Sequence, residues 1–162
     1  MVIYLDKDIE ELLHERKQFA SAFPNSLQLR QKRGHKEQEF SVKGEAGNQF
    51  LLIVRQNDLD PLDFSVILAA CPANSNRLFR LRRYNGMSHE HTNIIEANRF
   101  GGCHIHRATQ RYQELGIAED SYAEPTDTFV DLQSAWRCLL ADCGFELPQN
   151  PQIDLFPHEE QT

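Results

Sequence analysis

The amino-acid sequence predicts an α+β fold, in which an antiparallel β-meander of four to five strands packs against N- and C-terminal helices on one face. Apolar residues recur at helical spacing near both ends, while the segments between them alternate or form short apolar runs bounded by turn residues. The connections between these runs are short, which favours antiparallel neighbours. With 162 residues, 40% of them hydrophobic, the chain is long enough for one core.

Both predicted helices are amphipathic. The first follows Asp6 and Asp8, ends before Pro24, and places apolar side chains at Ile9, Leu12, Leu13, Phe19, Ala20 and Phe23. The last begins near Asp131, whose side chain can cap it, and ends at Gly144. Its apolar stripe consists of Leu132, Ala135, Trp136, Leu139 and Cys143.

The predicted strands lie between these helices. Residues 25–38 are polar and basic and form either a loop or an irregular edge strand, with charges at Arg30, Lys32, Arg33 and Lys36. A hairpin follows over residues 40–54, then a third strand over 62–70 and a fourth over 78–84. Residues 102–106 have the same alternation, and residues 107–115 form a short helix that ends at Gly116. We therefore expect one domain over residues 1–147 and a loosely ordered tail over 148–162.

Several classes of protein are excluded by what the sequence lacks. No run approaches the roughly 18 apolar residues that a membrane span requires, and the N-terminus does not read as a signal peptide, so we expect a cytoplasmic protein without a membrane partner. The cysteines at 71, 103, 138 and 143 contain no CxxC pair, so neither a disulfide framework nor a thiolate zinc site is expected. There is no P-loop, dinucleotide-binding glycine motif or HExxH motif.

The arginines are concentrated in one segment. Residues 77–111 hold seven of the twelve arginines, no lysine and two glutamates, so this segment carries +5 with neutral histidines while the whole chain carries −7. Such a local reversal predicts an anionic partner, and the planar guanidinium suits bidentate contact with phosphate. The arginines are Arg77, Arg80, Arg82, Arg83, Arg99, Arg107 and Arg111, and the glutamates are Glu90 and Glu96.

Four of the seven histidines lie within this basic segment, as His89-x-His91 and His104-x-His106. Side chains two residues apart on a strand share a face, so an extended backbone buries Cys103 and Ile105 and presents His104 and His106 together, about 6.5–7 Å apart. A phosphate or one metal ion fits between them. On the fourth strand the same alternation places Arg80, Arg82 and Tyr84 on the outward face.

The leading functional hypothesis is a metal-independent ribonuclease that uses histidines as general base and general acid on a phosphodiester. His104 and His106 are the preferred catalytic pair, with His89 and His91 as further candidates. The predicted substrate-binding residues are Arg80, Arg82, Tyr84, Arg107, Arg111 and Tyr112. In this mechanism no cofactor is needed, and the partner is RNA or another phosphate-bearing ligand.

Three alternatives use the same residues. His89, His91, His104 and His106 are numerous enough to hold zinc with an open coordination position. A non-catalytic module could instead bind nucleic acid or a protein through the charged surface. In the third alternative the arginines form a solvated strand face with ion pairs to Glu119, Asp120 and Glu124, and His89 and His91 hydrogen-bond their own turn. The acidic segment 119–127 could also dock a basic partner.

A resemblance to known families rests on two stretches of sequence. These are Arg82-Arg83-Tyr84-Asn85-Gly86-x-Ser88-His89-x-His91-Thr92-Asn93 and, after Phe100, His104-Ile105-His106-x-Ala108-Thr109-x-Arg111-Tyr112-Gln113. They resemble an uncharacterised bacterial family of unknown function and, more remotely, TumE-type toxins of toxin–antitoxin pairs. The resemblance implies a small prokaryotic or mobile-element protein that acts on nucleic acid as a toxin, with a protein antitoxin or a defence-system component as its partner. An antidote or anti-defence role is the corresponding non-catalytic alternative.

Overall fold

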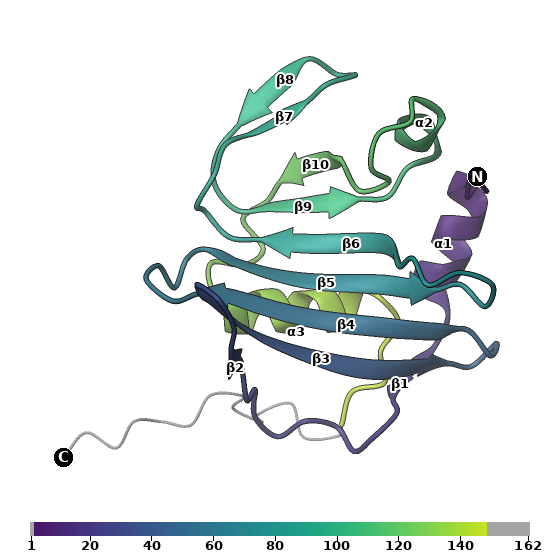
Figure 1. Cartoon of the computed structure of the whole chain (residues 1–162), viewed down its shortest axis with the longest axis vertical. Helices are drawn as coiled ribbons and strands as arrows, with labels where there is room; N and C mark the ends of the chain where they lie inside the picture. The colour runs from purple at the N-terminus through teal and green to yellow at the C-terminus, as the bar shows by residue number, and fades with distance from the viewer. Residues whose placement is uncertain (1, 149–162) are drawn as a thin grey trace.

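The computed structural model describes residues 2–148, which form an eight-stranded antiparallel sheet with helices on one face (Figure 1). The order along the sheet is β1-β3-β4-β5-β6-β9-β10, and β2 pairs with β3 beside this path. Strands β3 to β6 form the predicted meander, which β9 and β10 continue. The bounds are β1 Lys17–Phe19, β2 Arg30–Gln31, β3 His35–Gly44, β4 Gln49–Asn57, β5 Phe64–Cys71, β6 Phe79–Asn85, β9 His104–Arg107 and β10 Tyr122–Pro125.

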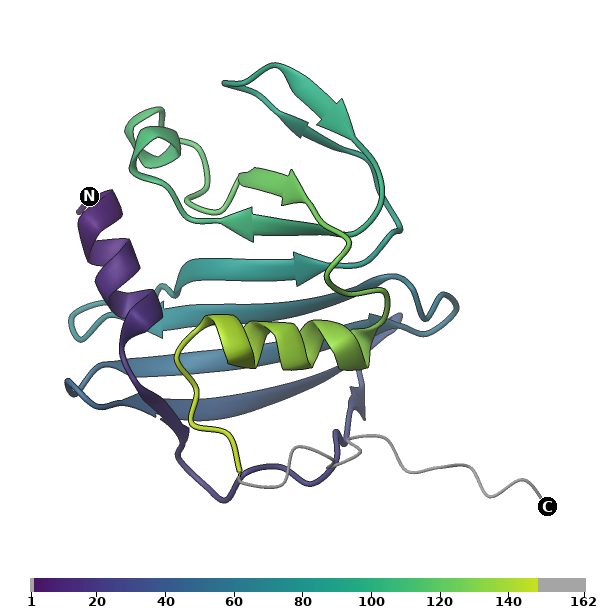
Figure 2. The same ribbon diagram turned by 180° about the vertical axis from the view of Figure 1, so that it is seen from behind.

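Helices α1 (Asp6–His14) and α3 (Leu132–Asp142) lie on the same face of the sheet, as Figure 2 shows. Their buried side chains share one hydrophobic core with the inward-facing residues of the strands. The predicted α+β class and the placement of both helices are confirmed, although the sheet has more strands than the four to five expected. The apolar stripe of α3 is buried as predicted, and Asp131 caps the helix in a reciprocal capping box with Ser134.

The N-terminal helix is shorter than predicted, because the chain turns into β1 after His14 instead of continuing to Pro24. We attribute this to Lys17, a fully buried lysine. Its ammonium group binds carbonyl oxygens at the C-terminal ends of both α1 and α3. Its Nζ donates to the carbonyl oxygens of Leu12, Leu13 and Glu15 at the end of α1, and of Cys143 just after α3, at 2.7–3.0 Å. A cation at a helix C-terminus satisfies carbonyl groups that have no partner within the helix.

The other elements follow the sequence prediction with local differences. The basic segment 25–38 contains the short edge strand β2 and the start of β3. Helix α2 (Gln110–Glu114) begins after the cap Thr109, so Arg107 belongs to β9, and Leu115 is exposed instead of packed inward. Within the predicted tail 148–162, residues 149–162 lie outside the described residues. No helix in the described part of the chain is long and apolar enough to cross a membrane.

A separate hairpin interrupts the meander between β6 and β9. It consists of β7 (His91–Asn93) and β8 (Asn98–Phe100), which pair only with each other. Figure 1 shows it at the β9–β10 end of the sheet. The hairpin therefore brings the segment around His91 back to the strand that carries the second histidine pair.

Candidate functional site

The face that each β6 side chain occupies is set by a β-bulge that the sequence did not reveal. The register between β5 and β6 shifts between Leu68 and Ala69, so strict alternation along β6 fails near Leu81. Tyr84 is fully buried on the helix side, where its hydroxyl donates to Asp142 of α3 at 2.6 Å. Arg82 shares that side. The predicted outward placement of Arg82 and Tyr84 is therefore wrong, and Arg83 takes the outward position instead.

Strand β9 presents both of its histidines on the face opposite to the helices. Tyr84 pairs with Ile105 across β6 and β9, which places Ile105 on the helix side and its neighbours His104 and His106 on the other. His106 pairs with Arg83, and His104 pairs with Asn85. The predicted alternation around Ile105 is thus confirmed. Both imidazoles are only 4% exposed, so the pair is buried.

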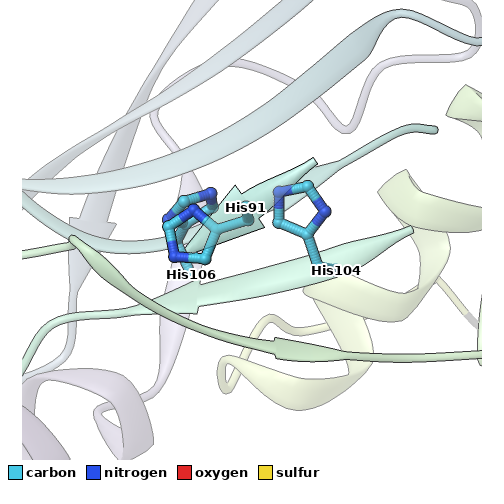
Figure 3. A group of neighbouring side chains, drawn as sticks. All are labelled: His91, His104 and His106. Atoms are coloured by element: carbon cyan, nitrogen blue, oxygen red, sulfur yellow. The ribbon is translucent and has the colours of Figure 1, made fainter. Parts of the chain in front are cut away.

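The third histidine of the cluster is His91, from β7 of the hairpin (Figure 3). Its ring centroid lies 5.6 Å from that of His104 and 4.7 Å from that of His106, and the latter two are 5.0 Å apart. One ring nitrogen from each histidine lies within 4.8 Å of the corresponding nitrogens of the other two. We call His91, His104 and His106 the histidine triad.

Hydrogen bonds fix the tautomer of each triad histidine. Nδ1 of His104 lies 2.9 Å from the carbonyl oxygen of Gly102, and Nδ1 of His106 lies 2.8 Å from that of Asp120. A carbonyl oxygen can only accept, so both Nδ1 atoms are protonated, and in the neutral rings both Nε2 atoms carry lone pairs. Arg83 Nη2 lies 3.4 Å from the same Nδ1 of His106, a longer contact than that to the carbonyl oxygen. The positive φ of Gly102 (+84°) produces the turn immediately before β9.

The tautomer of His91 is fixed by Asn93. The Asn93 amide donates to the carbonyl oxygen of Ala123 and accepts from the Ala123 N–H, at 2.8 and 2.9 Å, which sets the orientation of its oxygen. His91 Nε2 lies 2.9 Å from that oxygen and must therefore donate to it, so in the neutral ring Nδ1 carries the lone pair. Each triad histidine consequently has one nitrogen free to bind a metal ion.

The surroundings of His104 and His106 disfavour the protonated form of both rings. Burial, assisted by the adjacent Arg83 guanidinium, lowers the pKa of His106 to about 3. Burial also lowers the pKa of His104 below its ordinary value. Both rings are therefore neutral at pH 7, which is the state that metal ligation requires and that a general acid does not have.

Two contacts fasten the hairpin that carries His91. At the end of β7, immediately before the turn, the buried Asn93 binds both backbone groups of Ala123 on β10. At its turn, Glu96 accepts hydrogen bonds from Tyr112 at 2.6 Å and from Arg111 Nε at 3.1 Å. Arg111 and Tyr112, which the sequence assigned to substrate, therefore hold the hairpin in place.

The ion-pair alternative for the arginines matches what the structure shows. Arg80 and Arg83 approach the buried carboxylate of Asp120 at 3.7 and 3.3 Å, and Arg107 pairs with Glu124 at 3.3 Å. Glu119 adds contacts to Arg77 and Arg80, and a further pair joins Arg99 and Glu90. Arg80 and Arg107 therefore form ion pairs with the acidic segment 119–127. These pairs neutralise much of the positive charge of residues 77–111 and of the negative charge of the acidic segment.

Residues 5–143 match the model of a family described as a family of unknown function (DUF6978). The chain belongs to this family. No curated protein and no solved structure matches it. The expected resemblance to an uncharacterised domain family is confirmed at this level.

In this DUF6978 protein the triad opens onto a pocket of about 330 Å³. His89 lines the pocket but lies outside the triad, so three of the four predicted histidines come together. Gly86 lies at the pocket wall, where a Cβ atom would approach the carbonyl oxygen of Leu62 to 1.9 Å, and this contact explains the glycine. The lining also includes Asp63, Ser65, Arg83, Asn85 and Ser88.

Sequence reasoning did not select Arg83, Asn85 or Asn93. A signal for Arg83 was present in its neighbour, Tyr84. An aromatic ring suits the core better than a guanidinium group does, so Tyr84 should face the core and Arg83 the opposite side of the sheet. Asn93 has no such signal, because its role depends on a contact with Ala123, thirty residues away in the sequence.

Proposed function

We propose that the histidine triad binds a zinc ion and that the protein is a zinc-dependent hydrolase acting on phosphodiesters. The observation that carries this proposal is that each triad imidazole donates its N–H to an oxygen that can only accept, and keeps one lone pair. Histidine ligands of zinc are oriented by this kind of second hydrogen bond. Zinc held by three histidines with one open coordination position activates water near neutral pH.

The dimensions of the triad support a single ion. Tetrahedral zinc with Zn–N distances of about 2.1 Å places its ligand nitrogens about 3.4 Å apart. One ring nitrogen of each triad histidine lies within 4.8 Å of one from each of the other two, so closing to this spacing requires movements of about 1.4 Å or less. Two ligands come from β9 and are held by the sheet, whereas His91 comes from a hairpin whose turn end is fastened to β10 by Asn93 and to α2 by Glu96.

The metal-independent ribonuclease mechanism uses the same histidine pair but needs one imidazolium near neutral pH. Burial and the Arg83 guanidinium oppose that charge on His106. The geometry therefore favours the zinc alternative over acid–base catalysis by His104 and His106.

Arg83 and Asn85 support an anionic substrate. Both line the pocket, as the cross-strand neighbours of His106 and His104. The Asn85 oxygen accepts from Ser65 Oγ at 2.7 Å, which leaves its N–H groups to donate to an oxygen of the substrate. A phosphodiester bound there would place its oxygens between these donors and the zinc ion.

Elemental analysis of the full chain, purified without a histidine tag, tests the proposal. We expect one zinc per chain in the wild type and in His89→Gln, and none in His91→Gln or His104→Gln. Hydrolysis of a chromogenic phosphodiester should stop in chelator and return when zinc is added. If the wild-type protein contains no metal and its activity is unchanged in chelator, the zinc proposal is refuted. Acid–base catalysis by His104 and His106 would then be the favoured mechanism.

The biological setting is proposed from the sequence resemblance. We propose a bacterial, cytoplasmic protein related to TumE-type toxins, whose nuclease activity a protein antitoxin or a defence-system partner would control. Growth arrest on induction, relieved in His104→Gln, supports this setting. An antidote or anti-defence protein would instead be tolerated by the cell and would leave RNA intact.

A further inference from the structure

The face of the sheet that carries the triad also carries a polar row running across six strands. Successive registers place Arg30 of β2 opposite Glu37 of β3, Glu37 opposite Arg55 of β4, and Arg55 opposite Ser65 of β5. The row continues from Ser65 to Asn85 of β6 and ends at His104 of β9. Because directly paired residues share a face, all six side chains lie on the side away from α1 and α3.

This row is hollowed along part of its length. The triad pocket adjoins a second pocket of about 200 Å³, which His35 and Arg55 line, and the two share Asp63, Phe64 and Ser65. The hollow thus leads from the triad across β5 and β4 towards β3. Its far end lies beside the loop between β2 and β3.

That loop and the strand residues beside it carry the basic cluster that the sequence places at residues 30–36, with Lys32 and Arg33 in the loop, Arg30 on β2 and Lys36 on β3. Arg30, Lys32, Arg33 and Lys36 are all exposed. Within the described residues none of the four forms an ion pair with an acidic side chain, in contrast to Arg83 and Arg55, which pair with Asp120 and Glu37. The loop is therefore a concentration of unneutralised positive charge.

We infer that the row from Arg30 to His104 is a binding track for a single-stranded polynucleotide. This inference rests on the proposed function, because it assigns the phosphodiester at the triad to a longer chain. Five strand spacings of about 4.8 Å give the track a length of about 24 Å. At about 3.4 Å per stacked nucleotide, that length accommodates about seven nucleotides.

A single strand fits the observations better than a duplex. It can lower one phosphodiester into the triad pocket while the phosphates further along reach the basic loop. A duplex keeps its phosphates on a rigid helix and cannot do so without unpairing. Single-strand binding sites of this kind combine a basic groove with site sizes of about 4–16 nucleotides.

Fluorescence anisotropy with a labelled, unstructured RNA of about twelve nucleotides tests the track. The variant is Arg30→Gln/Arg33→Gln, and the matched control is Lys7→Gln/Arg137→Gln, which removes the same charge from exposed positions on α1 and α3. Loss of two phosphate contacts lowers the salt slope by about 1.4, which is about 25-fold in affinity at 0.1 M salt. The control should bind within about twofold of the wild type, since its charges lie off the track.

The outcomes separate the track from the zinc centre. A dinucleotide is too short to reach the loop, so its hydrolysis should be equal in the loop variant and the wild type. DNA of the same sequence should show the same dependence on the loop, because the track contacts the backbone.

Equal RNA affinity in the loop variant and the control, or no binding in any of them, would overturn the track even where zinc is present. Equally tight, loop-dependent binding of polyglutamate would assign the surface to an acidic protein. Absence of zinc with loop-dependent RNA binding would refute the hydrolase and leave the track standing.

Discussion

Asn93 provides the sharpest test of how the triad is assembled, because it joins the hairpin to the sheet and also orients His91. Its amide makes three hydrogen bonds, two to the backbone of Ala123 and one to His91, and the residue is 1% exposed. At a net value of about 1 kcal/mol for each hydrogen bond, Asn93→Ala removes about 3 kcal/mol from the docking of the hairpin. His91 then loses both its position and the acceptor that fixes its tautomer.

The expected consequence is weaker zinc binding with an intact sheet. Removing a group that orients a metal ligand lowers affinity about 10–100-fold. Asn93→Asp should lose less, because a carboxylate can still accept from His91. The matched control is Asn98→Ala, which removes the same amide from the exposed cross-strand partner on β8.

Zinc affinity is measured by competition with a chromophoric chelator, and far-ultraviolet circular dichroism confirms that the sheet is retained. If Asn93→Ala binds zinc as tightly as Asn98→Ala, the hairpin does not position a ligand and the triad is not a metal site of this design.

Two further predictions concern stability. Lys17→Met leaves four buried or partly buried carbonyl oxygens without their ammonium donor. In urea denaturation it should therefore lower the free energy of unfolding by about 2–4 kcal/mol. The control Lys43→Met, at an exposed position on β3, should change that free energy by less than about 0.5 kcal/mol. In chelator, acid should destabilise the protein through His106: its pKa is about 3 in the folded state, against about 6.5 when unfolded, so below pH 6.5 the unfolded chain takes up a proton that the folded chain does not. The stability difference between wild type and His106→Gln should therefore fall by about 2–3 kcal/mol between pH 7.5 and 4.5, and a constant difference would show that His106 protonates freely in the folded protein.

The parts of the fold that the sequence predicted are those governed by local periodicity. The stripe of α3 and its cap at Asp131 depend on neighbours within a few residues, and so does the alternation around Ile105 that pairs His104 with His106. The predicted length of the N-terminal helix was wrong because of Lys17, whose role depends on the carbonyl oxygen of Cys143, 126 residues away in the sequence. Periodicity alone cannot show that a lysine will be buried there to end two helices.

The site was likewise predicted only where it depends on residues that are close together in the sequence. Clustering in sequence identified His91, His104 and His106, but strict alternation assigned Arg82 and Tyr84 to the wrong face. One bulge between β5 and β6 reverses the faces, because the side-chain period of a strand is two residues. A register shift is set by pairing with another strand, so it leaves little trace in the sequence of the strand that it changes.

The electrostatic signal changes meaning in three dimensions. Residues 77–111 carry +5 in sequence, yet six of the seven arginines there ion-pair, with Glu90, Glu96, Glu119, Asp120 and Glu124. The arginine excess is therefore largely used within the fold, with Asp120 acting twice, through its carboxylate to Arg83 and through its carbonyl oxygen to His106. Among the described residues, positive charge without an acidic partner is found at the β2–β3 loop, outside that segment. A long anionic ligand would consequently be attracted first to the loop, while its position at the triad would depend on the few donors of the pocket.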